Sequence, residues 1–185
     1  MNCAYSFVCM RFFQYKGNLN LACKNHHYIN IILKSTFVPS NHAMGFIKGR
    51  SVRDNAALHV GKNYVFNTDL KDFFPSISQY MVCKNLQYAP FNFSDELAKL
   101  IAGLCCVVDG KGKDYKGYLP QGSPCSPIIT NIVCQKLDKK LSALARKYNL
   151  TYTRYADDIT FSSMHNVYQE NSAFISDFLK VVETE

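Results

Sequence analysis

The sequence predicts an α+β fold with the split β-α-β layout of ferredoxin-like domains, short of a final strand. Residues 63–69 contain Tyr, Val, Phe and Thr, which favour a strand. Residues 128–144 repeat apolar side chains at the spacing of a long amphipathic helix. Two runs rich in β-branched and aromatic residues, 151–155 and 159–162, flank a short acidic turn and indicate a β-hairpin. In this layout the first strand lies beside the hairpin.

Helix start and stop signals precede the first strand. Ser51 has the form of an N-cap, because Asp54 follows it by three residues as in a capping box. The helix should run to about Val60, where Gly61 is a natural C-terminal stop.

Local patterns predict the remaining elements. Apolar residues in 28–33 favour a helix, residues 73–76 turn the chain into a helical region, and residues 94–107 have helical spacing. Two glycines within 109–114 indicate a polar loop or hairpin tip. A last helix carries three apolar residues at helical spacing, namely Phe174, Phe178 and Val181.

Length and charge limit the class of protein. A chain of 185 residues with 48% hydrophobic content is long enough for one core, so we expect one domain with at most a small appendage. Twenty-one basic and fourteen acidic residues give a formal charge of +7, which favours a polyanionic partner. Most of the twelve Tyr and thirteen Phe should lie in the core, although aromatic faces can also stack on bases.

The eight cysteines form no C-x-x-C pair and lie mostly in apolar segments, so they should be small buried hydrophobes rather than disulfide or zinc ligands. They are Cys3, Cys9, Cys23, Cys83, Cys105, Cys106, Cys125 and Cys134. This usage favours a reducing compartment. The N-terminus lacks the basic region of a signal peptide, and no apolar run is long enough to span a bilayer. We therefore expect a soluble, cytoplasmic protein without a membrane partner.

Acidic residues occur at two places that the predicted layout brings together. Asp157 and Asp158 occupy the hairpin turn, and Asp69 ends the first strand and should face them. Adjacent aspartates raise one another's pKa unless a cation lies between them, so a rigid turn with two of them is costly without metal. A solvated surface turn is the alternative reading of the pair alone. Three carboxylates at one sheet end suit two Mg²⁺ ions, the apparatus of phosphoryl transfer.

Three segments carry a recognisable resemblance. Asp69–Phe74 (DLKDFF), Leu119–Pro127 (LPQGSPCSP) and Tyr155–Asp158 (YADD) resemble polymerase motifs A, B and C of reverse transcriptases in order and approximate spacing. The resemblance implies a right-hand polymerase palm built on the ferredoxin-like sheet, with partial helical fingers. It divides the chain into partial fingers at 1–62 and a palm at 63–185, cut before its last strand and without a thumb.

Within that family the chain looks most like bacterial retron reverse transcriptases. The segment Asn55–His59 is similar to the NAxxH element of retron enzymes, and the FFPSI ending of residues 69–77 and the run 151–155 also resemble them. Asn55 and His59 lie four residues apart on one helical face, so they can act together on RNA. A helix cap and a satisfied, partly buried histidine are the alternative.

The resemblance also implies roles for single residues at the acidic site. Asp69 and Asp157 should bind the catalytic metals, Asp158 should assist as the third catalytic carboxylate, and the backbone carbonyl of Leu70 completes one metal shell. Tyr155 joins the candidate nucleic-acid contacts. An uncovered sheet edge, where the last strand is missing, should favour self-association.

Nucleotide and template contacts are implied elsewhere. Phe74 matches the aromatic steric gate that rejects a 2′-hydroxyl, and its neighbour Phe73 is either part of the nucleotide floor or an ordinary core residue. Gln121 should contact the incoming nucleotide or template, with Gly122 allowing close backbone approach. Two further basic residues, Lys48 and Arg50, are candidate phosphate or template contacts, although exposed basic residues are usually just solvated. A basic segment that grips the triphosphate is poorly matched, since only Arg11 could stand for it.

The resulting expectation is an RNA-directed DNA polymerase that extends a primer hydroxyl with dNTPs on an RNA template. A retron-type enzyme would bind its own structured noncoding RNA, make RNA-linked DNA, and act in phage defence with an effector protein. Alternatives are a reverse transcriptase of a group II intron or an abortive-infection system, and a non-catalytic RNA-binding fragment. An RNA-dependent RNA polymerase shares the palm carboxylates, but bulky Phe74 argues against ribonucleotides.

Overall fold

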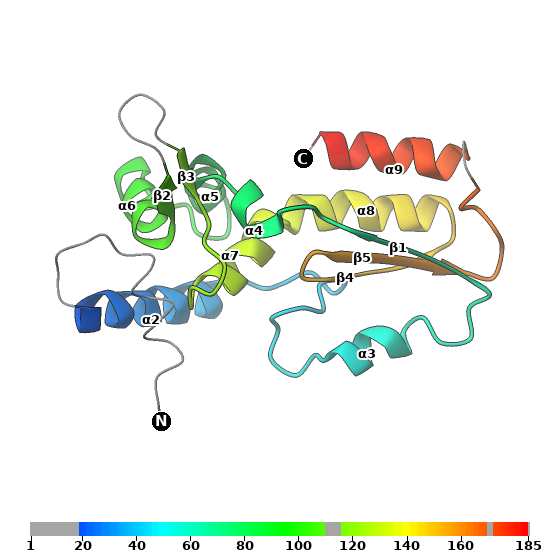
Figure 1. Ribbon diagram of the computed structural model, residues 1–185, viewed down its shortest axis with the longest axis horizontal. Coiled ribbons are helices and arrows are strands. Elements are labelled where there is room, and N and C mark those ends of the chain that lie inside the picture. Colours follow the sequence, from blue (N-terminus) through cyan, green and yellow to red (C-terminus); the bar gives the residue numbers. More distant parts are fainter. Residues whose placement is uncertain (1–18, 110–115, 170–171, 185) are drawn as a thin grey trace. The chain divides into compact units, whose positions relative to one another are not determined.

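A computed structural model describes residues 19–109, 116–169 and 172–184, with side chains described from residue 25 onward except that of Asp109. Most of the predicted loop at 109–114, together with Arg11, lies outside the described residues. The chain forms two compact units, each built from two separate segments (Figure 1). The first unit contains the described residues up to Val38 and Asp72–Val133, and the second contains Pro39–Lys71 and the chain from Cys134. The predicted division at residue 62 into fingers and palm stays a prediction.

The second unit contains a three-stranded antiparallel sheet. Its strands are β1 (Tyr64–Asp69), β4 (Thr151–Tyr155) and β5 (Asp158–Ser163), in the order β1-β5-β4. β5 follows β4 through a two-residue turn and pairs with β1 on its other side. The predicted hairpin, and the predicted position of the first strand beside it, are confirmed.

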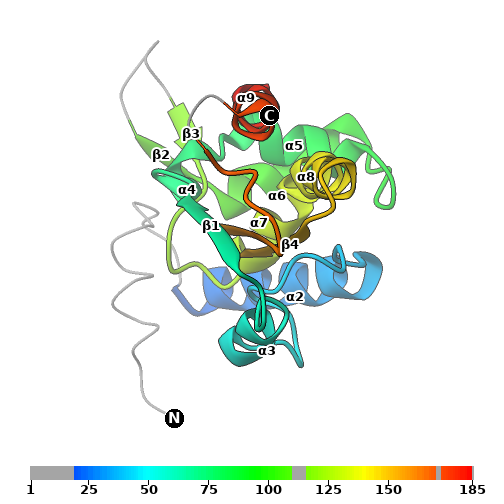
Figure 2. The same ribbon diagram turned by 90° about the vertical axis from the view of Figure 1, so that its right-hand side faces the viewer.

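Helices lie on both faces of this sheet. α8 (Gln135–Lys147) and α9 (Ala173–Glu183) lie on one face, and α3 (Val52–Ala57) lies on the other, as the two views show (Figures 1 and 2). Side chains alternate between the faces of a strand. Accordingly Tyr152 packs toward α8, whereas its neighbour Thr153 contacts a histidine that follows α3.

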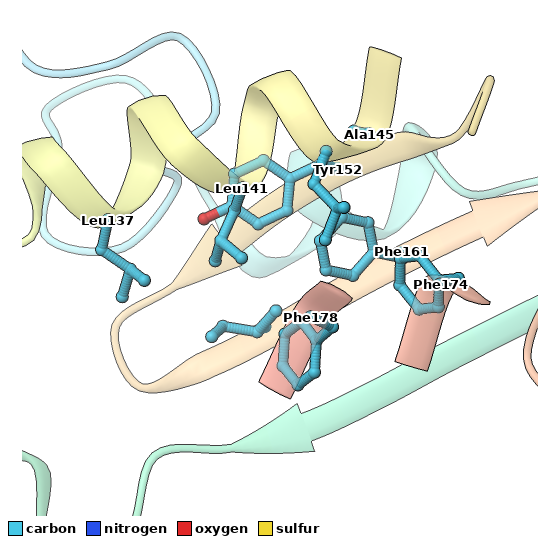
Figure 3. Close-up of a cluster of buried hydrophobic side chains, with 9 residues drawn as sticks. Leu137, Leu141, Ala145, Tyr152, Phe161, Phe174 and Phe178 are labelled. Atoms are coloured by element: carbon cyan, nitrogen blue, oxygen red, sulfur yellow. The ribbon is translucent and has the colours of Figure 1, made fainter. Parts of the chain in front are cut away.

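An aromatic core joins the sheet to α8 and α9 (Figure 3). Phe161 of β5 is fully buried, and its ring stacks on Tyr152 at 4.9 Å between centroids. Phe174 and Phe178 of α9 meet it edge to face. Burying a side chain of this size contributes about 1.5–3 kcal/mol. Leu141 of α8 is also fully buried in this cluster. The core therefore fixes the hairpin against α8.

The first unit is mainly helical. Its helices are α2 (Leu19–Thr36), α4 (Phe73–Ser76), α5 (Gln79–Gln87), α6 (Asp95–Cys105) and α7 (Ser126–Val133). Ser78 and Ser94 cap α5 and α6 through their side chains. A short two-stranded sheet, β2 (Val107–Asp109) with β3 (Lys116–Tyr118), completes it. No helix within the described ranges is both long and apolar enough to cross a membrane.

Two helix predictions need correction. The single helix predicted over 128–144 is two helices, because α7 ends at Val133 and α8 begins at Gln135. The intervening Cys134 is also where the chain passes from the first unit to the second. No Gly or Pro marks this break and the apolar pattern continues through it, so the sequence pattern alone predicts one helix. The capping box of Ser51 and Asp54 is confirmed, but α3 ends at Ala57 rather than near Val60.

The cysteines with described side chains behave as small buried hydrophobes, as predicted. They are free and buried, namely Cys83, Cys105, Cys106, Cys125 and Cys134. Burial raises the pKa of Cys106 to about 12 and that of Cys134 to about 11, so both remain thiols at neutral pH. Cys3, Cys9 and Cys23 fall outside the described side chains.

Candidate active site at the acidic turn

Three aspartates meet at one end of the β1-β5-β4 sheet. Asp69 ends β1 and pairs in register with Asp158, the first residue of β5. Asp157 lies in the preceding turn, and its carbonyl accepts a hydrogen bond from the Leu70 amide at 3.2 Å. The backbone thus joins the end of β1 to the turn at two adjacent positions. The predicted juxtaposition of the three acids is present in the structure.

These carboxylates interact electrostatically. Partial burial, followed by the charges of Asp157 and Asp69, raises the pKa of Asp158 above its ordinary value. Asp69 and Asp158 are exposed and Asp157 is half-buried, so all are within reach of solvent ions. Carboxylate oxygens are the ligands that hard divalent cations prefer, and a cation would relieve the repulsion. Among the described residues, however, no three acidic, His or Cys side chains are already gathered closely enough to hold a metal.

The carboxylate oxygens therefore suit a divalent ion chemically. The described side chains are not yet arranged closely enough to surround one. Asp69, Asp157 and Asp158 could each supply carboxylate oxygens. Leu70 follows Asp69 directly, and its amide is bonded to the turn.

A buried ion pair lies behind the acidic turn. Arg154 of β4 and Asp138 of α8 are 0% and 1% exposed, and form a bidentate pair. Arg154 Nε donates to Oδ1 at 2.7 Å and Nη2 donates to Oδ2 at 2.8 Å, while Nη1 donates to the carbonyl of Ala156 at 2.7 Å. Although burial opposes the charge, contact with Asp138 raises the pKa of Arg154, which stays cationic.

The sequence analysis did not predict this pair, although the sequence contains a signal for it. Arg154 lies two residues after core-facing Tyr152, so the alternation of the strand places a charge on the buried face. Asp138 interrupts the apolar stripe of α8 between Leu137 and Leu141. One charge in each core-facing pattern indicates a buried pair, because an unpaired charge there would be costly.

The loop before α3 lies against the same turn. The amide of Arg154 bonds to the His42 carbonyl at 2.8 Å, and its carbonyl accepts from the Met44 amide at 2.7 Å. Gly45 is buried, and a Cβ at this position would collide with the backbone nitrogen of Ala156. Only glycine allows the loop backbone to come this close.

The predicted basic contacts occupy this loop in different ways. Arg50 directs Nη1 at the carbonyls of Ser40, Asn41 and Ala43, so part of its guanidinium organises the loop. Lys48 is exposed. A role in nucleic-acid binding stays a prediction for both residues.

The Asn55–His59 pair lies on the α3 side of the sheet. His59 is half-buried, and its ring nitrogens bond to Ser162 Oγ at 2.6 Å and Thr153 Oγ1 at 2.7 Å. Burial, and then the charge of Lys62, lowers the pKa of His59. These contacts favour the alternative of a satisfied histidine. Asn55 differs, because its side-chain oxygen is buried without a hydrogen-bond partner among the described residues.

The predicted nucleotide contacts belong to the first unit. Gln121 and Gly122 are exposed in the loop before α7, and Gly122 has φ +89°, a conformation that favours glycine. Phe73 is buried, whereas Phe74 is half-buried and meets it edge to face at 5.5 Å. The core alternative thus suits Phe73 better than Phe74. The convergence of these residues, and of half-buried Tyr155, on bound nucleotide or nucleic acid stays a prediction.

A buried histidine anchors the loop at 119–125, and sequence reasoning missed it too. His26 of α2 bonds through Nε2 to the Leu104 carbonyl at 2.8 Å and through Nδ1 to Ser123 Oγ at 3.2 Å. Because a carbonyl only accepts, Nε2 carries the proton and Nδ1 accepts from the serine. Cys125 Sγ donates to the His26 carbonyl at 3.0 Å. Contacts 97 and 99 residues apart leave no local signal.

Comparison with known proteins agrees with this geometry. The family described as reverse transcriptase (RNA-dependent DNA polymerase) matches residues 19–184. The chain belongs to the reverse transcriptase family.

Curated relatives of this reverse transcriptase chain include several retron enzymes. It is 42% identical over 130 residues to the retron Mx162 reverse transcriptase of Myxococcus xanthus, covering 65% of this chain and 26% of that protein. It is 37% identical over 134 residues to the retron Ec86 reverse transcriptase of Escherichia coli, covering 72% and 38%. The retron Mx65 reverse transcriptase of Myxococcus xanthus is 40% identical over 141 residues, covering 71% and 33%. The matched region is therefore about a quarter to two fifths of these relatives.

Proposed function

We propose that the protein is a retron-type RNA-directed DNA polymerase, and that this chain supplies its fingers and palm. The observation that carries the proposal is the meeting of Asp69, Asp157 and Asp158 at one sheet end, in a chain of the reverse transcriptase family. The similarity to retron enzymes supports the retron type.

The acidic turn would hold the divalent ions that this family generally uses. Asp69 and Asp157 provide the main carboxylate ligands, Asp158 assists, and the carbonyl of Leu70 adds a neutral oxygen. We propose two Mg²⁺ ions, which when bound supply activation of a primer hydroxyl and charge stabilisation at a leaving pyrophosphate. The hydrogen bond from the Leu70 amide to the Asp157 carbonyl keeps the end of β1 beside the turn while these ligands bind.

The first unit would receive the nucleotide. Phe74 excludes a 2′-hydroxyl, with buried Phe73 supporting its ring. Exposed Gln121 contacts the incoming nucleotide or template, and Gly122 lets the backbone approach it. Template contacts would come from Lys48, Arg50, Asn55, His59 and Tyr155.

The biological role follows the retron type. The partners are an RNA template within a structured noncoding RNA, dNTPs and the DNA product, and the RNA-linked DNA would serve phage defence in the cytoplasm with an effector protein. A group II intron or abortive-infection enzyme is the rival type. Flanking genomic DNA separates them, because a retron gene adjoins its noncoding RNA.

Primer extension tests the polymerase directly. The protein at the length of its natural gene should extend a primer on an RNA template with dNTPs and Mg²⁺, and Asp157→Asn should abolish extension because an amide is a poor ligand for a hard cation. Lys99→Met is the matched control, since Lys99 forms a surface ion pair with Asp95. Both residues lie in the first unit, whereas Asp157 lies in the second. A silent wild-type protein would refute the polymerase proposal and favour a non-catalytic RNA-binding module.

Sugar selection tests the gate. Phe74→Val should incorporate rNTPs as well as dNTPs, because the smaller side chain leaves room for a 2′-hydroxyl. The matched control is Phe91→Val, a change at a buried phenylalanine of the same unit that should leave sugar selection unchanged. A Phe74→Val enzyme that still excludes rNTPs would remove Phe74 from the gate.

A further inference from the structure

The acidic turn has a strained backbone that its own sequence does not favour. Ala156 has φ +57°, a left-handed conformation that costs a non-glycine residue about 1–2 kcal/mol. Such a conformation persists where the surroundings determine it. The contacts around Ala156 therefore hold the turn in this conformation.

The guanidinium of Arg154 makes one of these contacts. Its Nη1 donates to the Ala156 carbonyl, the oxygen of the peptide that leads into Asp157. Its other edge is held by both carboxylate oxygens of Asp138. A planar group held at two edges cannot rotate without losing a charge-assisted hydrogen bond.

The carboxylate that holds Arg154 is itself fixed. Asp138 Oδ1 also accepts from the Tyr152 hydroxyl at 2.8 Å. Asp138 lies in the first turn of α8, where a negative charge is favoured by the helix dipole. Its neighbours Leu137 and Leu141 are anchored in the aromatic core. The anchored helix α8 therefore fixes the position of the guanidinium through Asp138.

A second support comes from the loop before α3. His42 and Met44 bond to the backbone of Arg154, and Gly45 lies against the backbone of Ala156. The strand end is held through its main chain while the turn is held through the guanidinium.

We propose that Arg154 and Asp138 are positioning residues that fix the Ala156–Asp157 peptide and so hold Asp157 ready for a metal ion. This inference rests on the proposed metal role of Asp157. A purely structural ion pair would stabilise the unit without influencing metal affinity, so the two roles can be separated.

The separating variant is Arg154→Met combined with Asp138→Leu. Replacing a buried pair by apolar residues of similar volume is often neutral for stability, whereas removing one partner is not. The double variant therefore removes the donor to Ala156 without leaving an unpaired buried charge. Arg154→Lys is the second variant, since a single ammonium nitrogen lacks the planar fork whose three nitrogens reach the two carboxylate oxygens and the Ala156 carbonyl.

Binding of Mn²⁺ to the protein at its natural length, followed by electron paramagnetic resonance, is the main measurement and needs no turnover. Loss of an outer-shell support typically weakens metal affinity about 10–100-fold, and we expect the folded double variant to fall in that range. Its melting temperature should fall only modestly, because the Tyr152 hydroxyl loses its acceptor but no charge is left unpaired. Hydrogen exchange at the Leu70 amide should accelerate, because its acceptor is the Asp157 carbonyl. Arg154→Lys should show a smaller loss in the same direction.

Two further variants make the outcome decisive. Lys147→Met with Asp177→Leu removes the more exposed α8–α9 ion pair of the same unit and should leave Mn²⁺ affinity unchanged. Asp157→Asn should eliminate the Mn²⁺ site, and unchanged binding in that variant would refute the proposed function itself. Folded variants of the Arg154–Asp138 pair with wild-type Mn²⁺ affinity and Leu70 exchange would overturn the positioning role alone. If the double variant does not fold, the same two measurements on Arg154→Lys decide between the roles.

Discussion

The acidic turn and the loop at 119–125 solve a similar problem with different chemistry. Each contains a left-handed residue, Ala156 in the turn and Gly122 in the loop. A buried ion pair supports the turn, whereas neutral hydrogen bonds from His26 support the loop. Ala156, for which the left-handed conformation is unfavourable, has the charged support. Gly122, which adopts this conformation readily, has the neutral one.

The difference concerns what happens when each support is damaged. A charge left alone in the interior is expensive, so half of an ion pair is worse than none. A neutral group left alone costs less, because its desolvation penalty is smaller. Removing one partner should therefore lower the free energy of unfolding more at the turn than at the loop.

Breaking the ion pair on one side should have the largest effect. Asp138→Ala leaves the Arg154 guanidinium buried without its carboxylate, and should lower the free energy of unfolding by about 3–5 kcal/mol. Denaturant unfolding measures this value. A loss below about 1 kcal/mol would mean that water or another acid reaches Arg154.

Breaking the neutral support should cost less. His26→Ala leaves the Leu104 carbonyl and the Ser123 hydroxyl without this partner, and should lower the free energy of unfolding by about 1–3 kcal/mol. The same denaturant series ranks it against Asp138→Ala. A larger loss for His26→Ala would reverse the comparison between the two regions.

A backbone change sharpens the comparison within the loop. Gly122→Ala puts a Cβ on a residue at φ +89°, and should destabilise the protein by about 1–2 kcal/mol. Thermal unfolding is the measurement, with Gly103→Ala inside helix α6 as a control that should not destabilise. Equal effects at both glycines would show that Gly122 is not held in this conformation.

The smallest expected effect is on pH dependence. Burial lowers the pKa of His26 and of half-buried His59, so below about pH 6.5 the unfolded chain takes up protons first. Stability contributed by the neutral rings is present above that pH and is lost as the pH falls. Unfolding curves of His26→Gln and His59→Gln should lose part of this slope. A slope unchanged in both variants would contradict the lowered pKa values.

The acidic site was largely predictable from sequence, because its signals are local. Strand composition, the turn and the order of the three motifs place Asp69 opposite Asp158, as the register confirms. The supports behind it were not predictable in the same way. Arg154 needs a partner on another element, and His26 contacts residues about a hundred positions away. Each depends on which faces of distant elements meet.

Two boundaries show the same limit at the level of elements. The break at Cys134 has no Gly or Pro, and its apolar pattern continues into α8, so the pattern alone predicts one helix. The Ser51 capping box, by contrast, is a signal within four residues and was predicted correctly. Arg50 was predicted from its charge, whereas three carbonyls of its own loop occupy one of its nitrogens.

Strand β1 offers a practical opportunity that follows from its place at the edge of the described sheet. Its outer backbone groups face no further described strand, and Tyr64 and Val65 are 41% and 57% exposed. An extended peptide could add to such an edge by main-chain hydrogen bonds, with its alternate side chains packing on the exposed residues. Because β1 ends at Asp69, a peptide of this kind would carry a reporter or a blocking group to the acidic end of the sheet.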